Sequence, residues 1–156
     1  MKLRTLASLL LALTAAPALI QAQDASPAAP AHPKKEKTPL EKQMSKIGKA
    51  VRALKKQVGD ATQNASSLEL VATIHDAAQA SLALVPAKST GLPDADKAKM
   101  VSAYKTAMNE FIATVDQLAA ALKAGNNAEA AKIFPKLMDL EKKDHHEFRK
   151  PEKKTA

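Results

Sequence analysis

The chain of 156 residues contains no cysteine and no tryptophan, and only 3% of its residues are aromatic. Without cysteine there is no disulfide framework, no thiolate metal site, no lipid anchor through cysteine and no cofactor bonded through a Cys-x-x-Cys-His motif. The stability of the fold therefore has to come from packing of the apolar side chains, which make up 46% of the chain.

Patterns typical of catalysis and of β-structure are also absent from the sequence. No Ser/His/Asp set, carboxylate pair or glycine-rich phosphate loop stands out, so we do not expect an enzyme. No segment alternates apolar and polar residues with the period of a strand. An alanine-rich composition at this length instead suits one modest all-α domain.

Both ends of the chain differ in composition from the middle. Residues 1–22 have the form of a cleaved secretory signal: Lys2 and Arg4 precede an apolar run from Leu6 to Ile20 that is too short to span a membrane. Residues 23–37 are rich in Pro, Ala and Lys, which predicts a disordered linker. We expect the domain over 38–150 and a frayed tail over 151–156. A periplasmic location follows if the source is a bacterium.

The formal net charge is +8, and removal of Lys2 and Arg4 with the signal leaves +6. Nucleic acid is a poor partner for an exported protein, so the surplus indicates either solvated surfaces or attraction to acidic redox partners. After removal of the signal, the sequence contains no integral membrane segment, and we expect a monomer.

Three segments place apolar residues in steps of three and four, the pattern of one buried stripe on an amphipathic helix, and a fourth carries a further set of mostly apolar residues. We predict helices over 39–58, 66–85 and 94–124 and a fourth from residue 127 to about 150. The stripes are Leu40, Met44, Ile47, Val51, Leu54 and Val58; Leu68, Val71, Ile74, Ala78, Leu82 and Val85; Val101, Tyr104, Met108, Phe111, Val115, Leu118 and Leu122; and Ile133, Phe134, Leu137, Leu140, His145 and Phe148.

Residues that start, stop or bend helices mark the segment boundaries. Thr38 with Glu41, and Ser66 with Glu69, have the spacing of capping boxes, and Gly125 is placed to end the third helix. Pro135 lies inside the fourth helix and predicts a kink near 131–134. Because three short connections force neighbouring helices to pack antiparallel, the expected fold is an up-down-up-down four-helix bundle.

This topology brings the start of the first helix and the end of the last to the same end of the bundle. Met44 and His145 each lie about five residues from that end, which is roughly 7 Å of helix. A thioether and an imidazole that face each other across an apolar interior suit a low-spin haem iron. With both axial positions filled by protein, such a centre transfers electrons and has no open position for a substrate.

The chain also resembles the cytochrome b562 family of periplasmic haem proteins. The resemblance lies in Leu40-Glu41-x-x-Met44, in Gly125 and Glu129, and in His145-x-x-Phe148-Arg149, and it covers residues 40–149. It implies one non-covalent haem b with Met44 and His145 as iron ligands and Arg149 near a haem propionate. Tyr104 and Met108 stand where the family has pocket aromatics, which implies a looser pocket.

Two other interpretations remain open from the residues alone. Met44 also suits a core position, and His145 suits a helix end, so the bundle could be a haem-free interaction module of the periplasm. A copper or zinc site built from Asp144, His145 and His146 with a methionine is the other, although adjacent histidines diverge on a helix. Met100 is a rival methionine ligand at the same end of the bundle, and His146 is expected to face solvent.

Overall fold

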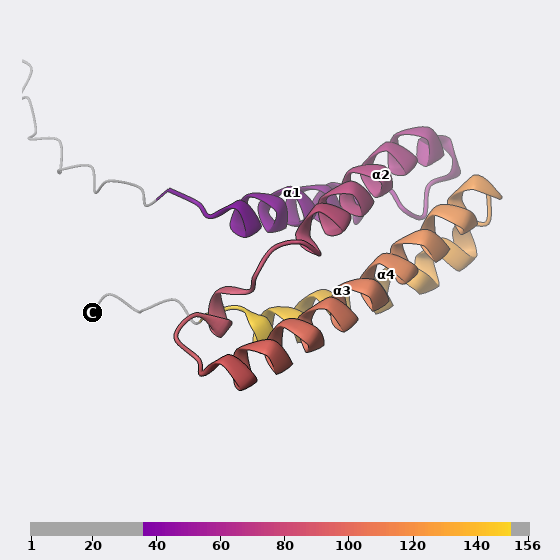
Figure 1. Cartoon of the computed structure of the whole chain (residues 1–156). Coiled ribbons are helices and arrows are strands. Elements are labelled where there is room, and N and C mark those ends of the chain that lie inside the picture. The colour runs from indigo at the N-terminus through magenta and orange to yellow at the C-terminus, as the bar shows by residue number, and fades with distance from the viewer. Residues whose placement is uncertain (1–35, 151–156) are drawn as a thin grey trace, which may run out of the picture. The chain divides into compact units, whose positions relative to one another are not determined.

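The computed structural model describes residues 36–150, which form four α-helices (Figure 1). They are α1 (Pro39–Leu54), α2 (Asn64–Ser81), α3 (Asp94–Lys123) and α4 (Asn127–Phe148), with single 3₁₀ turns at η1 (Ala61–Gln63) and η2 (Ala87–Ser89). The described part of the chain contains no strand, so the predicted all-α four-helix bundle is confirmed. The expected signal and tail, and the linker up to residue 35, lie outside the described residues.

The first helix begins where the capping pattern predicts. The backbone N–H of Glu41 donates to Oγ1 of Thr38 at 3.2 Å, and the N–H of Thr38 donates to Oε2 of Glu41 at 2.7 Å. Pro39 occupies the first turn, where its missing N–H costs nothing. This reciprocal pair satisfies two backbone donors at a helix start and fixes where the turn that carries Met44 begins.

The end of the first helix differs from the prediction, because α1 stops at Leu54 and not at Val58. The N–H groups of Lys56 and Gln57 donate to carbonyls three residues back, at Ala53 and Leu54, so the chain tightens into turns after α1. Val58 is still buried, at 8% exposure. Apolar spacing predicted which side chain is buried but not the backbone geometry that carries it.

The predicted capping box at Ser66 and Glu69 is wrong. Helix α2 begins two residues earlier, at Asn64, and has no side-chain cap. The hydroxyl of Ser66 instead donates to the carbonyl oxygen of Gln63 at 3.1 Å and accepts from Nε2 of Gln57 at 2.9 Å. Ser66 therefore does not cap α2 and instead links the helix to Gln57, in the turns that follow α1.

Helix α2 also ends earlier than predicted, at Ser81 and not at Val85. The N–H groups of Leu82 and Leu84 donate to carbonyls three residues back, and Val85, assigned to the buried stripe, is 51% exposed. The connection to α3 is consequently twelve residues long and contains η2. Because α2 ends at Ser81, it does not extend along the first turns of α3.

The turn between α3 and α4 depends on Gly125, whose φ is +67°. Its N–H donates to the carbonyl of Leu122, and the N–H of Asn126 donates to the carbonyl of Ala121, which is the hydrogen-bond pair of a Schellman motif. A residue with a Cβ would be strained at that φ. Helix α4 then runs without interruption through Pro135, and the predicted kink there stays a prediction.

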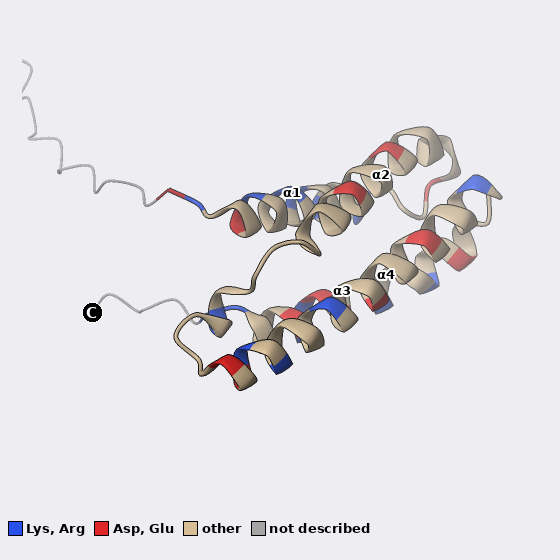
Figure 2. Ribbon diagram, in the orientation of Figure 1, with Lys and Arg blue, Asp and Glu red and all other residues tan. Residues whose placement is uncertain are grey.

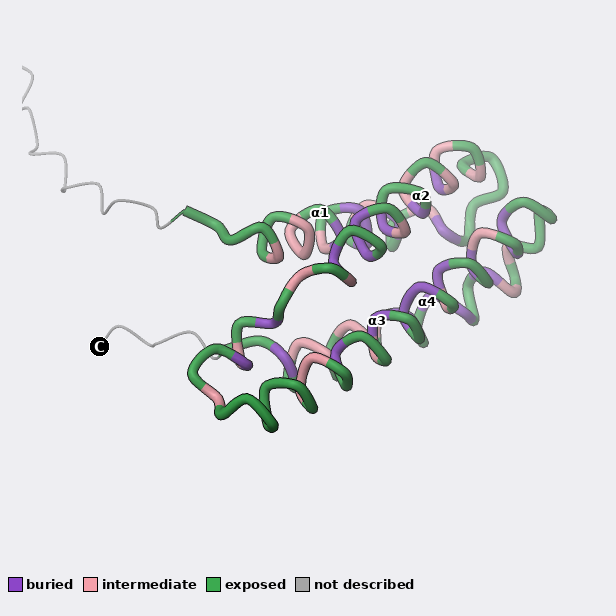
Figure 3. Tube along the Cα trace, viewed as in Figure 1, coloured by how far each residue is buried: buried purple, intermediate pink, exposed green. Residues whose placement is uncertain are grey.

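The core is formed by the inward stripes of all four helices, as the purple segments in Figure 3 show. Helix α1 packs on α2, α2 on α3 and α3 on α4. The largest fully buried side chains include Leu54, Ile74, Leu118, Leu122 and Leu137. Removal of water from such side chains, each worth roughly 1.5–3 kcal/mol, is the main force that holds the bundle together.

Two asparagines connect the hairpins at the end of the bundle away from Met44. Nδ2 of Asn127 donates to Oδ1 of Asn64 at 2.7 Å, and Nδ2 of Asn64 donates back to Oδ1 of Asn127 at 3.1 Å. Nδ2 of Asn127 also donates to the carbonyl of Val58 at 3.2 Å. This amide pair satisfies backbone groups of two different turns and sets the relative register of α2 and α4.

Candidate cofactor site

Met44 from α1 and His145 from α4 line the same small cavity. Its volume is about 30 Å³, and both side chains are half-buried. The other lining residues are Ile47 from α1, Met108 and Phe111 from α3, and Glu141 and Asp144 from α4. The structure therefore brings together the two residues that were predicted as ligands, although ligation itself stays a prediction.

Helices α1 and α4 both line this cavity, but they do not pack as closely as α1 on α2 or α3 on α4. A Cβ added at Gly48, one turn after Met44, would lie 3.5 Å from Nη1 of Arg52 and 3.9 Å from Oε1 of Glu141. Glu141 is in turn one helical turn before His145 on α4. Both distances are ordinary van der Waals contacts, so an alanine at position 48 would be accommodated beside the cavity.

The donor chemistry of the cavity fits haem, whereas its volume does not. Ile47, Met108 and Phe111 are each at most 5% exposed and give the thioether and the imidazole apolar surroundings, and this pair of donors suits a haem iron with two axial ligands. However, 30 Å³ is far below the roughly 300–1,000 Å³ of ordinary cofactor pockets. A macrocycle would fit between these side chains only if α1 and α4 moved apart.

Tyr104, predicted to lie against the cofactor, is buried but is not among the residues that line the cavity. Its ring packs edge to face on Phe148, with centroids 5.5 Å apart and an interplanar angle of 76°. Its hydroxyl donates to the carbonyl oxygen of Ser81 at 3.2 Å. Burial raises the pKa of Tyr104 to about 12, while the side chain of Ser81 opposes this rise and the charge of Asp144 adds to it.

Asp144 brings an unsatisfied polar atom to the cavity. Its Oδ1 is buried and has no hydrogen-bond partner in the part of the chain that the structure describes. Burial raises the pKa of this carboxyl, and the nearby Glu110 and Glu147 raise it further, while Lys143 and His145 oppose them. From the sequence, Asp144 was considered only as a possible metal ligand, although it lies four residues after Leu140 and four before Phe148 on the apolar stripe.

Two further lining residues could have been found from the sequence. Ile47 and Phe111 lie one turn from Met44 and Met108 on the same apolar stripes. Since residues three apart on a helix are surface neighbours, each would be expected beside its predicted partner. From the sequence, the spacing of these residues predicted only that they are buried in the core.

Arg149, predicted near a propionate, follows the last turn of α4 and is exposed. Its backbone N–H donates to the carbonyl of His145 at 3.1 Å, and its side chain is not among those that line the cavity. His146 is exposed, as predicted, and its carbonyl accepts from Nζ of Lys88 at 3.4 Å. Met100, the rival methionine, is partly buried against the core and does not line the cavity.

The alternative copper or zinc site receives no support from the geometry. Among residues 36–150, no three His, Asp or Glu side chains lie where they could hold one metal ion. The remaining histidine in this range, His75, bridges two acids, with Nε2 3.6 Å from Oδ1 of Asp116 and Nδ1 3.5 Å from Oδ1 of Asp76.

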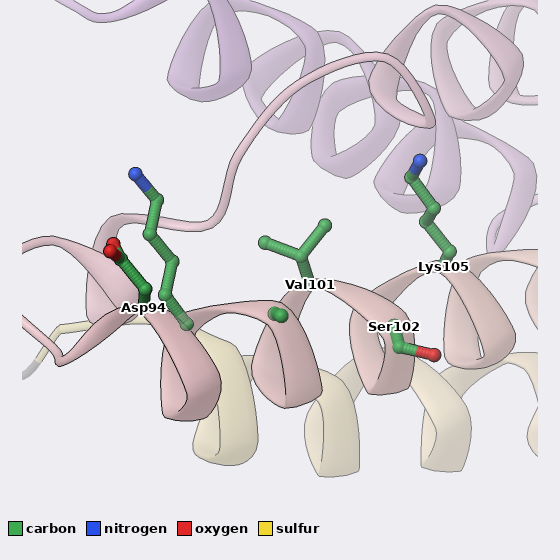
Figure 4. A pocket seen from close by; sticks show the side chains of 6 residues that line it. Asp94, Val101, Ser102 and Lys105 are labelled. Carbon is green, nitrogen blue, oxygen red and sulfur yellow. The ribbon is translucent and has the colours of Figure 1, made fainter.

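A second, more open hollow lies over the first turns of α3 (Figure 4). Its volume is about 520 Å³, and six residues of α3 line it: Asp94, Lys97, Ala98, Val101, Ser102 and Lys105. Figure 4 shows Val101 and Lys105 projecting to the same side of the helix. The sequence analysis did not identify this hollow, because its two lysines interrupt the apolar pattern.

Comparisons with known proteins give one match. Residues 39–149, most of the chain, match the family model described as Cytochrome b562. No curated protein and no solved structure gives a significant match. In residues 36–150, no helix has the length and apolar content needed to cross a lipid bilayer.

The raised pKa of Tyr104 predicts a late alkaline transition. The chain has a single tyrosine, so tyrosinate absorbance reports this group alone. We expect half-ionisation of the folded apoprotein near pH 12 and not near 10.0. Because folding favours the neutral phenol, the stability that Tyr104 contributes is complete below pH 10 and is lost as the pH rises towards 12.

Tyr104→Phe is the control for this measurement, since it keeps the ring and removes the ionisable group. Its free energy of unfolding should change less between pH 10 and 12 than that of the wild type. A phenol that titrates near pH 10 while far-ultraviolet circular dichroism still shows folded helix would contradict the buried, hydrogen-bonded position.

Proposed function

The chain belongs to the cytochrome b562 family, and on that premise we propose that it holds one non-covalent haem b between Met44 and His145. The family consists of haem-binding electron carriers of the periplasm. The observation that carries the proposal is that both side chains, 101 residues apart in sequence, line one cavity. The function proposed is periplasmic electron transfer.

The residues around the cavity have distinct roles in this proposal. Met44 would hold the iron through its sulfur and His145 through an imidazole nitrogen, while Ile47, Met108 and Phe111 would keep water away from them. A bound haem supplies a one-electron iron couple, whose potential Met/His ligation raises. Since both axial positions belong to the protein, no position is left for a substrate, and the proposal is a carrier and not an enzyme.

Binding requires the end of the bundle that carries these ligands to open. The amide pair of Asn64 and Asn127 lies at the other end, where it holds the hairpins in register. The side chains between Met44 and His145 are apolar apart from Glu141 and Asp144. We therefore propose that α1 and α4 separate at the cavity while the far end stays closed, with the buried oxygen of Asp144 regaining solvent.

Titration of the purified domain with haemin tests the ligand assignment. We expect a shifted Soret band and the spectrum of a six-coordinate low-spin iron with a one-to-one endpoint. Met44→Ala and His145→Ala should each abolish the low-spin spectrum and weaken haem affinity by at least tenfold, because each removes one axial bond.

Met100→Ala and His146→Ala are matched controls of the same residue types outside the cavity. Their spectra and affinities should match those of the wild type. If either ligand variant keeps the low-spin spectrum, the ligand assignment is wrong. If haemin gives no Soret shift with the wild type, a haem-free interaction module becomes the better description.

The charge distribution supports an acidic redox partner. Residues 39–56, which comprise α1 and the two lysines that follow it, contain six Lys or Arg and one Glu. Helix α2 contains two acidic residues and no Lys or Arg. Helix α3 has four residues of each sign, and α4 has four basic and five acidic residues. Figure 2 shows this contrast between α1 and α2. The positive excess of the described helices thus lies on the helix that supplies Met44. We propose that an acidic partner docks on this outer face of α1.

Charge reversal on α1 tests this docking face. For Lys42→Glu, Lys46→Glu and Lys49→Glu combined, we expect binding of poly-glutamate by the apoprotein and oxidation of the reduced haem protein by anionic hexacyanoferrate to fall about tenfold at low salt. Both effects should shrink as salt is added. The control is Lys132→Glu, Lys136→Glu and Lys143→Glu on α4, with the same change in net charge. Equal losses in the two variants would show a general charge effect and no docking face.

Export of the chain is a further part of the proposal, carried by the composition of residues 1–22. The protein recovered from the periplasm of a bacterial host should begin at Gln23, as measured by intact mass. A chain without residues 1–22 should stay in the cytoplasm. Recovery of the full-length chain from the cytoplasm with residues 1–22 still attached would contradict a cleaved signal.

A further inference from the structure

The open hollow on α3 has an apolar floor between two lysines. Ala98 and Val101 form the floor, and Lys97 and Lys105 stand two turns apart on either side of Val101. The volume of the hollow is about 520 Å³, and it is a shallow depression open to solvent, not an enclosed cavity. The hollow thus combines the apolar surface of Ala98 and Val101 with the positive charges of Lys97 and Lys105.

The hollow adjoins the proposed haem site along α3. It ends at Lys105, and the cavity begins at Met108, one helical turn further on. Tyr104 lies between them, and its hydrogen bond to the last residue of α2, Ser81, marks where α2 stops. The ten residues of α3 before Tyr104, about 15 Å of helix, therefore have no α2 beside them.

Neither lysine is neutralised within the described part of the chain. Lys97 and Lys105 form no ion pair there, and the hollow contains one carboxylate, that of Asp94. Two ammonium groups and one carboxylate leave the hollow net positive, one helical turn along α3 from the apolar site. An anionic group would reduce this excess.

We propose that Lys97 and Lys105 bind the two propionate carboxylates of the haem. This inference rests on the proposed function and assigns the residues that hold the charged edge of the cofactor. Ionised carboxylates cannot enter the apolar interior between Met108 and Phe111 without a large desolvation cost, so in this proposal they lie outside it, on the side of the hollow. On that side the flexible lysine stems bring ammonium groups to them from both ends of the hollow.

A comparison of haemin with haemin dimethyl ester, which has the same ring but no carboxylates, tests this assignment. We expect the wild type to bind haemin more tightly than the ester by about tenfold. Lys97→Gln with Lys105→Gln should remove most of that preference, at about fivefold or less per lysine for partly solvated pairs. Ester affinity and the low-spin spectrum should be unchanged, because the iron ligands are untouched.

The matched control is Lys99→Gln with Lys123→Gln, two exposed α3 lysines that do not line the hollow. It removes the same charge and should keep the preference for haemin. Thermal melting of each apoprotein checks that all variants fold. Arg149→Gln provides a third comparison, because a preference that depends on Arg149 and not on the lysines would overturn the assignment.

The failures of the two proposals differ in their signatures. If the wild type binds haemin and its ester equally with a low-spin spectrum, the lysine assignment falls and the haem site stands. If the preference drops equally in the control pair, the effect is long-range charge and the assignment also falls. If neither porphyrin binds, the proposed function and this inference fail together.

Discussion

Burial of one apolar stripe from each helix in a shared interior is the interaction on which the rest of the structure depends. With no cysteine and few aromatic residues, the domain has aliphatic packing and little else to stabilise it. Residues such as Ile74, Val115 and Leu118 have no exposed surface, and interiors of this kind tolerate little change of volume. The predicted ligands Met44 and His145 belong to the edges of these stripes, so their positions follow from the packing of the core.

The two ends of the bundle are built differently. At the far end, Asn64 and Asn127 exchange hydrogen bonds and satisfy a backbone carbonyl, an arrangement that is costly to disrupt because the freed groups would be buried without partners. At the ligand end, the cavity contains an unsatisfied carboxylate oxygen of Asp144, and α2 stops at Ser81. An end that already carries an uncompensated polar atom and lacks one helix loses less when it opens. This asymmetry is consistent with a bundle that admits a flat group at one end only.

The helices differ in their net charge. The outer face of α1 is basic, whereas α3 and α4 carry nearly balanced charges. On α3, Lys97 and Lys105 are an exception, since they lie with Val101 over a hollow. Solvation explains the charges of an outer face without further assumptions, but lysines that flank an apolar floor beside a cavity suggest a ligand that is itself part apolar and part anionic. Haem has that character.

Several features could be predicted from residue spacing because they depend on contacts within one or two turns. The capping pair of Thr38 and Glu41, the helix end at Gly125 and the burial of Tyr104, Met108 and Phe111 are of this kind. The predicted cap at Ser66 was wrong because its hydroxyl accepts a hydrogen bond from Gln57. Gln57 lies nine residues earlier in the sequence, outside the range that a capping pattern covers. Val85 was assigned to the core because nothing local shows that α2 stops at Ser81, where Tyr104 of another helix meets its last carbonyl.

The sequence by itself determined the number of helices, their buried faces and the equal depth of Met44 and His145, because period and helix rise are local properties of the chain. Only the tertiary structure decided that these two side chains share a cavity of about 30 Å³, that Asp144 turns an oxygen into buried space without a partner, and that Lys97 and Lys105 flank a hollow. Those features depend on how far apart the helices lie and where a neighbouring helix ends. Such distances are set by the packing of all four stripes together and by no segment alone.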